Sequence, residues 1–200
     1  MTVSRISFER AHAFTAAREG GLTEHPADPG GITNYGVSLR FLREQGVDID
    51  GDGDIDAADI RALTPAMAAE IMRRAFWEPL RCQRLPAPLG AVLYDTAVNC
   101  GPRRAVRLMQ RCCNVVGEAH LDAFTPLAED GLCGPRTLEL AQALGEVGLA
   151  AYTARACVRA RQDLYRSIVR GNPSLQVFLQ GWRNRCAALL DFLAELEREA

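Results

Sequence analysis

An acid, a second acid and a hydroxyl lie near the start of the chain, and together they could cleave a glycosidic bond. Glu19 ends an apolar helical pattern and is followed by two glycines, so it marks the C-terminal end of a helix. The negative end of the helix dipole favours the protonated form of a carboxyl group, as a general acid requires. Asp28 lies in a polar turn where it stays ionised, and it can orient a water molecule or stabilise an oxocarbenium-like transition state. Thr33 can hold that water by a hydrogen bond.

A simpler interpretation of the same residues remains open. Glu19 alone would be a solvated glutamate at a helix end, and residues 28–31 alone would be a turn. Glu24 could replace Asp28 as the second carboxylate, and Asp28 could instead cap the turn. The spacing of the whole block over residues 19–36 favours a catalytic Glu19.

A mainly α-helical fold is expected to position these side chains. Apolar residues recur at helical spacing over residues 6–18, while Ser38 and Thr64 are suited to cap helices over 39–45 and from 65 towards 79. Further helical patterns cover residues 89–99, 103–116, 136–144, 147–170 and 175–198. The Gly- and Pro-rich residues 22–37 predict a small β-hairpin or turn region beside Glu19.

Composition argues against several classes of protein. The formal net charge of −2 argues against nucleic acid as a partner. The chain contains no lysine, because all 23 Lys and Arg positions are arginine, and this excludes Schiff-base and P-loop chemistry. The seven cysteines show no CxxC or zinc-like spacing, so we expect reduced structural thiols.

The location of the protein can also be predicted. No apolar run approaches the ~20 residues of a transmembrane helix, and residues 1–10 lack the apolar core of a signal peptide. We therefore expect that the protein is made in the cytoplasm and does not insert stably into a membrane. A substrate in the periplasm or outside the cell would then require a holin or a secretion system for export.

An acidic loop over residues 48–59 has the pattern of an EF-hand calcium site. Gly53 would supply the sharp turn and Ile55 the apolar anchor. The expected ligands are Asp48, Asp50, Asp52 and Asp59 through carboxylates, Asp56 through a water molecule, and Asp54 through its backbone carbonyl.

The last ligand position of this loop departs from the usual pattern. Asp59 stands where a longer glutamate normally binds, so it would reach the ion with one oxygen or favour Mg²⁺ over Ca²⁺. Six aspartates repel one another strongly without a cation. We therefore predict a structural Ca²⁺, with a solvated acidic turn as the alternative.

Three segments of the chain resemble the N-acetylmuramidases of glycoside hydrolase family 108, the secretion-activator and phage-endolysin type of lysozyme. They are residues 19–36, in which Leu22 takes an aromatic position of the family pattern, and residues 94–102 and 130–137. The resemblance implies that Glu19 is the catalytic acid and that catalysis needs no cofactor. It also implies a lysozyme-like domain over residues 1–115 that contains the acidic loop, followed by a helical, peptidoglycan-binding-like part over 116–200.

A substrate cleft is expected around four further side chains. Tyr35, Tyr94, Asp95 and Asn99 offer the stacking and hydrogen-bonding groups of a sugar site. Asp95 and Asn99 are four residues apart on one helix face, and the resemblance places this segment along the cleft. The alternative is an ordinary helix that Asn99 caps.

Two weaker patterns concern cell-wall binding. Arg103, Arg107 and Arg111 fall on one helix face, which could meet anionic wall peptides or simply be solvated. Residues 130–137 resemble a motif of peptidoglycan-binding helical modules, and they would otherwise be a plain loop and helix cap.

These patterns favour a peptidoglycan hydrolase, a lysozyme-type muramidase that cleaves the β-1,4 bond between N-acetylmuramic acid and N-acetylglucosamine. A lytic transglycosylase is the second hypothesis, because that reaction needs one acid and no positioned water, so Asp28 and Thr33 would be dispensable. The third is a non-catalytic, calcium-dependent cell-wall-binding module built on the acidic loop and residues 130–137.

Overall fold

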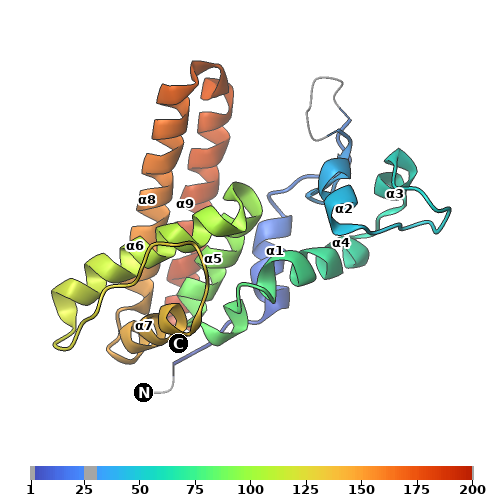
Figure 1. The fold of residues 1–200 in the computed structure, drawn as a ribbon. Coiled ribbons are helices and arrows are strands. Elements are labelled where there is room, and N and C mark those ends of the chain that lie inside the picture. The colour runs from blue at the N-terminus through green and yellow to red at the C-terminus, as the bar shows by residue number, and fades with distance from the viewer. Residues whose placement is uncertain (1–2, 25–30, 200) are drawn as a thin grey trace.

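The computed structural model describes residues 3–24 and 31–199, which form a mainly α-helical fold with a small hairpin (Figure 1). This fold class is the predicted one. The α-helices are α1 (Phe8–Ala16), α2 (Leu39–Gln45), α3 (Ala57–Ala62), α4 (Pro65–Met72), α5 (Ala87–Cys100), α6 (Pro102–His120), α7 (Pro135–Glu146), α8 (Ala150–Gly171) and α9 (Gln176–Arg198). The antiparallel strands are β1 (Thr33–Asn34) and β2 (Val37–Ser38).

Helix caps explain where several elements begin. The Ser38 hydroxyl accepts a hydrogen bond from the backbone N–H of Phe41, and Thr64 does the same for Met67, so both predicted caps are confirmed. α4 then passes into a π-helical segment, Arg73–Trp77. The short helix α3 was not predicted, and it begins within the acidic loop because the Asp56 side chain caps it.

The hairpin is closed by a two-residue turn. Tyr35 and Gly36 have φ of 49° and 80°, which is the left-handed pair that twists β1 and β2 correctly against each other. Asn34 is buried and donates from Nδ2 to the carbonyl oxygen of Ile60 at 3.1 Å. This bond fastens the hairpin to α3.

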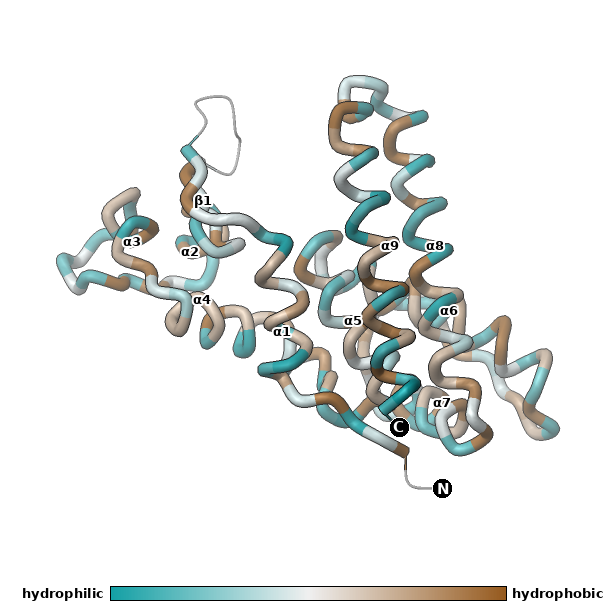
Figure 2. The backbone as a smooth tube through the Cα atoms, turned by 180° about the vertical axis from the view of Figure 1, so that it is seen from behind, coloured by the Kyte–Doolittle hydropathy of each residue, from teal (hydrophilic) through white to brown (hydrophobic). Residues whose placement is uncertain are grey.

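α5 is the central helix of the molecule. Residues 91–97 are all buried, and the helix packs on α1 on one side and on α6, α8 and α9 on the other. Hydrophilic and hydrophobic residues alternate along α8 and α9, which present their apolar faces to this core (Figure 2).

The first and last helices are in contact. The rings of Phe14 in α1 and Phe192 in α9 stack with their centroids 4.7 Å apart, and Arg10 forms an ion pair with Glu199. One hydrophobic core therefore runs through the chain, and residue 115, the predicted domain boundary, lies inside α6.

Membrane and redox features are simple. In the part of the chain that is described, no helix combines the length and apolar character that membrane crossing requires. All seven cysteines are described, and each is a free thiol.

Candidate active site

Glu19 lies in a turn beyond the end of α1. The helix ends at Ala16, earlier than the predicted residue 18, and the backbone N–H of Glu19 donates to the Ala16 carbonyl at 3.1 Å. Gly20 then takes φ of 75° and redirects the chain. The electrostatic effect of a helix dipole fades within its last turn. Because Glu19 lies beyond the last turn of α1, the nearby side chains determine its electrostatic environment.

The hairpin turn packs directly against Glu19. A Cβ atom at Gly36 would lie 2.9 Å from Cγ of Glu19 and 3.1 Å from Cε of Met72. Only glycine fits this position, both for its positive φ and for the space that Glu19 occupies. The carboxylate is therefore held at a fixed place between the hairpin and the helical body.

Arg185 of α9 lies on the other side of Glu19. Its Nη1 is 2.6 Å from Oε1 of Glu19, and the two side chains are 7% and 20% exposed. The contact is a close ion pair without the alignment of a hydrogen bond, since Oε1 is buried and accepts none among the described residues. Oε1 thus faces Arg185, and the remaining exposure of Glu19 belongs to the rest of its side chain.

Asp95 binds the Arg185 guanidinium and fixes its position. Arg185 donates to Asp95 through Nη2 at 2.7 Å and through Nε at 3.1 Å, and Arg161 of α8 donates to Asp95 Oδ2 at 2.6 Å. The Thr15 hydroxyl donates to Oδ1 at 3.2 Å. Burial acts to raise the pKa of Asp95, but the guanidinium groups of Arg185 and Arg161 outweigh it and hold that pKa below its ordinary value.

Arg161 extends this network to the predicted cleft helix. Its Nε donates to the hydroxyl of Tyr165 at 2.5 Å, and that hydroxyl donates to Oδ1 of Asn99 at 2.5 Å. The side chain of Arg161 is fully buried, and its pKa is raised because the charge of Asp95 outweighs the effect of burial. The network therefore joins α1, α5, α8 and α9.

Sequence reasoning missed Arg161 and Arg185. Neither lies in a local motif, and the available signal was their position on apolar helix faces, at helical spacing from buried residues such as Val158 and Leu189. An arginine on such a face needs a buried anion, and Asp95 supplies it.

The four predicted cleft residues separate into two pairs. Tyr94 and Asp95 are fully buried, so the prediction that they contact substrate finds no exposed surface to support it. The hydroxyl of Tyr94 instead pairs with Nδ1 of His12 at 2.9 Å. Asn99 and Tyr35 are half-buried, and both retain surface that a ligand could reach.

Of the other two predicted catalytic residues, Thr33 and Asp28, the structure describes only Thr33. Thr33 is half-buried in β1, and its backbone pairs with that of Thr23 at 2.8 and 2.9 Å. Asn34 and Val37 form the buried face of the hairpin, so Thr33 lies on the opposite face. Asp28 lies outside the described residues.

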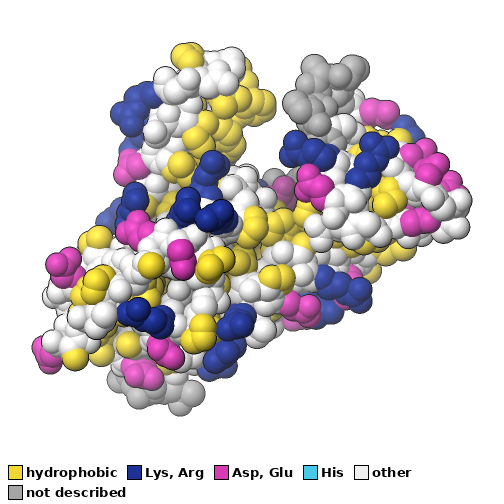
Figure 3. All heavy atoms as spheres, in the orientation of Figure 1, with side chains coloured by type: hydrophobic (Ala, Val, Ile, Leu, Met, Phe, Trp, Pro, Cys, Tyr) yellow, Lys and Arg dark blue, Asp and Glu magenta, His cyan; other side chains and the backbone are white. Residues whose placement is uncertain are grey.

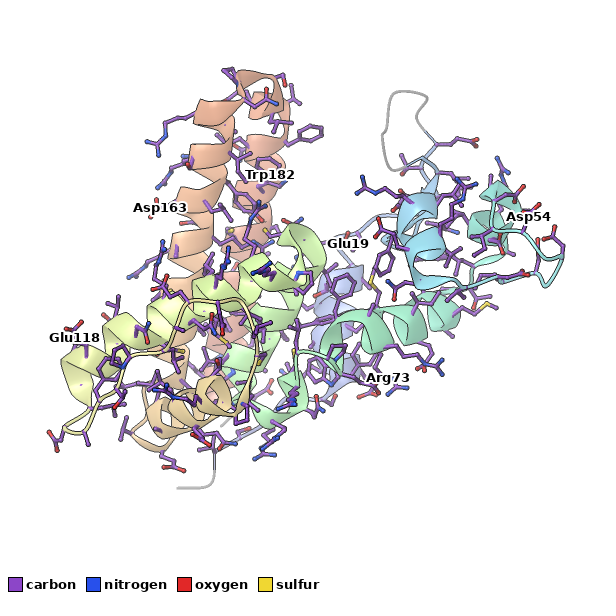
Figure 4. All side chains as sticks on the ribbon, viewed as in Figure 1. Glu19, Asp54, Arg73, Glu118, Asp163 and Trp182 are labelled. Atoms are coloured by element: carbon purple, nitrogen blue, oxygen red, sulfur yellow. The ribbon has the colours of Figure 1, made fainter. Side chains whose placement is uncertain are left out.

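A pocket of about 520 Å³ opens next to the ion pair of Glu19 and Arg185. The surface is hollowed between the α8–α9 hairpin and the part of the molecule that carries β1 and α2 (Figure 3). Glu19 lies near the base of this hollow, and Trp182 lies on α9 (Figure 4). The pocket lining includes Ala17, Arg18, Asn99, Trp182, Asn184 and Arg185.

The acidic loop contains two groups of carboxylates that could hold a cation. Oxygens of Asp48, Asp50 and Asp52 lie within 4.8 Å of one another, and so do those of Asp54, Asp56 and Asp59. The charge of Asp52 is the main cause that raises the pKa of Asp54, which shows the repulsion inside the loop.

The carboxylates of the first group are half-buried or exposed, and both oxygens of Asp48 accept from backbone N–H groups, those of Gly51 and Gly53, at 2.6 and 3.0 Å. Asp59 is buried, and its two oxygens accept from the backbone N–H groups of Ile49 and Asp56 at 2.6 and 2.7 Å. These hydrogen bonds lower the pKa of Asp59 and connect the two ends of the loop through its carboxylate.

Residues of both wall-binding patterns make contacts within the protein, while the side chains of Arg103, Arg107 and Arg111 remain exposed. Gln110 is buried, donates to Asp130 Oδ1 at 2.9 Å and accepts from the N–H of Gly131 at 2.9 Å, so residues 130–137 are fastened to α6. In the arginine stripe, Arg103 donates to the Asp130 carbonyl and Arg111 pairs with Glu129 at 3.0 Å.

Comparison with known proteins agrees with this architecture. Residues 12–101 match the family model described as Glycosyl hydrolase 108, and residues 104–187 match the Predicted Peptidoglycan domain. The chain is similar to the structure of Brucella abortus SagA, with a TM-score of 0.72, 25% identity and 94% of each chain covered. No curated protein matches the chain.

Proposed function

We infer a peptidoglycan hydrolase from the match of residues 12–101 to the Glycosyl hydrolase 108 family model and of residues 104–187 to the Predicted Peptidoglycan domain. We propose that this hydrolase is an N-acetylmuramidase. It cleaves the β-1,4 bond between N-acetylmuramic acid and N-acetylglucosamine. Its substrate lies in the periplasm or outside the cell, and a holin or a secretion system brings the enzyme to it.

One observation carries this proposal. Two distant parts of the chain hold the Glu19 side chain, which is 20% exposed, beside an open pocket that its neighbour Arg18 and its partner Arg185 line. Gly36 fixes the side chain from the hairpin, and Arg185 fixes it from α9. Such preorganisation is typical of a catalytic group, because a freely solvated glutamate at a turn needs neither contact.

In the proposed reaction the protonated form of Glu19 donates its proton to the glycosidic oxygen as the bond breaks. The carboxylate that forms is stabilised by Arg185, whose own position depends on Asp95 and not on Glu19 alone. Asp28 and Thr33 would position the attacking water or stabilise the positive charge that develops on the sugar ring. Calcium takes no part in these steps, and we propose that it binds the acidic loop as a structural ion.

The lytic transglycosylase remains the second candidate, because a single acid at Glu19 is all that it requires. In that reaction the 6-hydroxyl of the muramic acid residue attacks internally and leaves an anhydro-sugar end. The non-catalytic wall-binding module is disfavoured, since the buried network and Gly36 position Glu19 more closely than a binding surface would require.

The test compares wild type, Glu19→Gln and the control Glu139→Gln, which changes an exposed glutamate of α7. We expect wild type and the control to clear a suspension of purified cell walls, with new reducing ends detected by mass spectrometry. Glu19→Gln should lose at least about a hundredfold in rate. Equal clearing by Glu19→Gln would show that Glu19 is not the acid, and anhydro-sugar ends would identify a transglycosylase.

A further inference from the structure

The pocket beside Arg185 has an aromatic wall. The indole of Trp182 stacks on the ring of Tyr165 with centroids 4.8 Å apart and planes 20° apart, and the ring centroid of Phe178 lies 6.0 Å from that of Trp182. Trp182 is half-buried and Phe178 is 53% exposed. Aromatic rings on an open surface provide flat apolar area for a ligand.

The network below the pocket holds this aromatic wall rigidly. The Tyr165 hydroxyl is fixed by the hydrogen bonds to Arg161 and Asn99 already described. Because Trp182 stacks on Tyr165, its plane is fixed as well. A rigid aromatic platform binds a ligand without the entropy cost of ordering a mobile side chain.

Hydrogen-bond donors surround the platform. Asn99 and Asn184 use their Oδ1 atoms to accept from Tyr165 and Gln180, and their Nδ2 groups donate to no other group in the described residues. Arg18 also lines the pocket and is exposed, while its Nη1 donates to the Phe14 carbonyl and its guanidinium lies over the Phe14 ring. The pocket therefore combines a flat aromatic face with donors around it.

This combination matches the chemistry of an N-acetylated sugar. Such a ring offers a C–H face that stacks on an indole, and its rim carries acetamide and hydroxyl oxygens that accept hydrogen bonds. A muramic acid residue also carries a carboxylate, which suits the positive charge of Arg18.

The pocket adjoins the proposed catalytic centre. Arg185 lines it and forms the ion pair with Glu19, and Trp182 precedes Arg185 by three residues on the same face of α9. Arg18 is the residue next to Glu19 in the chain. A glycan strand with one bond at Glu19 would therefore place a neighbouring sugar over Trp182.

We propose that the pocket walled by Trp182 is a sugar-binding subsite, which holds the peptidoglycan glycan strand next to the bond that Glu19 protonates. The inference rests on the proposed function. It assigns part of the substrate site to the C-terminal half of the chain, on α9, and it assigns binding to Trp182 and Asn184, which no sequence pattern indicated.

Binding is best measured without turnover, in the Glu19→Gln background. The probe is a soluble tetrasaccharide of alternating N-acetylglucosamine and N-acetylmuramic acid, titrated by calorimetry. Adding Trp182→Ala should raise Kd about tenfold or more, and Trp182→Phe should restore most of the affinity. Asn184→Ala changes an exposed residue with little risk to folding and should raise Kd about threefold. The matched control is Tyr152→Ala, an exposed aromatic on α8 outside the pocket.

The outcomes separate the subsite from the proposed function. An unchanged Kd in folded Trp182→Ala and in Asn184→Ala, or an equal loss in Tyr152→Ala, would overturn the subsite even if wild type releases reducing ends from cell walls. Conversely, a Trp182-dependent Kd with no release of reducing ends by wild type would support the subsite and contradict the muramidase activity. If Trp182→Ala does not fold, Asn184→Ala and Trp182→Phe decide the question.

Discussion

At the scale of single residues, Gly36 is the position on which the place of Glu19 depends. We predict that Gly36→Ala lowers the rate of wall cleavage at least about tenfold, since a Cβ 2.9 Å from Glu19 Cγ must displace the carboxylate. The positive φ should also cost about 1–2 kcal/mol of stability. Turbidity loss per folded molecule and the free energy of unfolding measure the two effects.

Gly46 provides the matched control for this variant. It has φ of 65° at the end of α2, and a Cβ there would meet no atom within 4 Å. Gly46→Ala should therefore lose a similar amount of stability and retain full activity per folded molecule. If both variants lose activity equally, backbone strain alone explains the effect and the contact with Glu19 is unimportant.

At the scale of elements, the acidic loop joins α2 to α3 and is the place where an ion would act on the fold. Because the folded loop gathers carboxylates that the unfolded chain separates, Ca²⁺ should stabilise the protein by linkage. At ~100 times Kd the gain is about 2.7 kcal/mol, which corresponds to about 5–10 °C in Tm for a chain of this size. Calorimetry with Ca²⁺, Mg²⁺ and chelator measures it.

The double variant Asp48→Ala, Asp52→Ala should lose this response to Ca²⁺. Asp122→Ala with Asp191→Ala removes the same charge from exposed positions elsewhere and should keep the response. A Tm that ignores both ions and chelator would mean that the loop is only an acidic turn. Loss of turnover on chelation with the fold intact would instead show that the ion belongs to the mechanism.

At the scale of the whole molecule, Asp95 joins the two halves of the chain. It lies on α5, and its two partners, Arg161 and Arg185, lie on α8 and α9. We predict that Asp95→Asn lowers the free energy of unfolding at pH 7 by about 3–5 kcal/mol, because it leaves two buried guanidinium groups without their anion. Denaturant unfolding followed by circular dichroism measures the loss.

The pH dependence of this effect has a definite sign. The folded state lowers the pKa of Asp95, so its stabilisation is complete above the unfolded pKa of about 4 and is lost as the pH falls through the lower folded value. The difference in stability between wild type and Asp95→Asn should therefore shrink with falling pH in that range. A difference that stays constant down to strongly acidic pH would contradict the assigned role of the carboxylate.

The two tryptophans can show whether the halves unfold together. Trp77 lies in the N-terminal half and Trp182 on α9, so Trp182→Phe and Trp77→Phe each leave one reporter. Because the core is continuous, the unfolding midpoints reported by Trp77 and by Trp182 should coincide. Both midpoints should shift by the same amount when Asp95→Asn is added. Separate midpoints would show that the halves are independent domains.

Local patterns in the sequence were enough to predict most helices and the identity of the candidate acid. Ser38 and Thr64 cap the helices they were expected to cap, because a cap is decided within a few residues of the chain. The type and spacing of residues 19–36 pointed to Glu19 and to a hairpin beside it, and the family matches agree with the resemblance on which that interpretation rested.

Only the tertiary structure decided what surrounds Glu19. Arg185 is far from Glu19 in the chain, and its ion pair arises from the packing of α9 against α1 and α5, which no local periodicity encodes. The same packing buries Asp95, which was expected to line the cleft. It also places Trp182 in the lining of the pocket. The sequence by itself predicted most helices and a candidate acid, whereas the charges and surfaces around Glu19 depend on contacts between residues far apart in the chain.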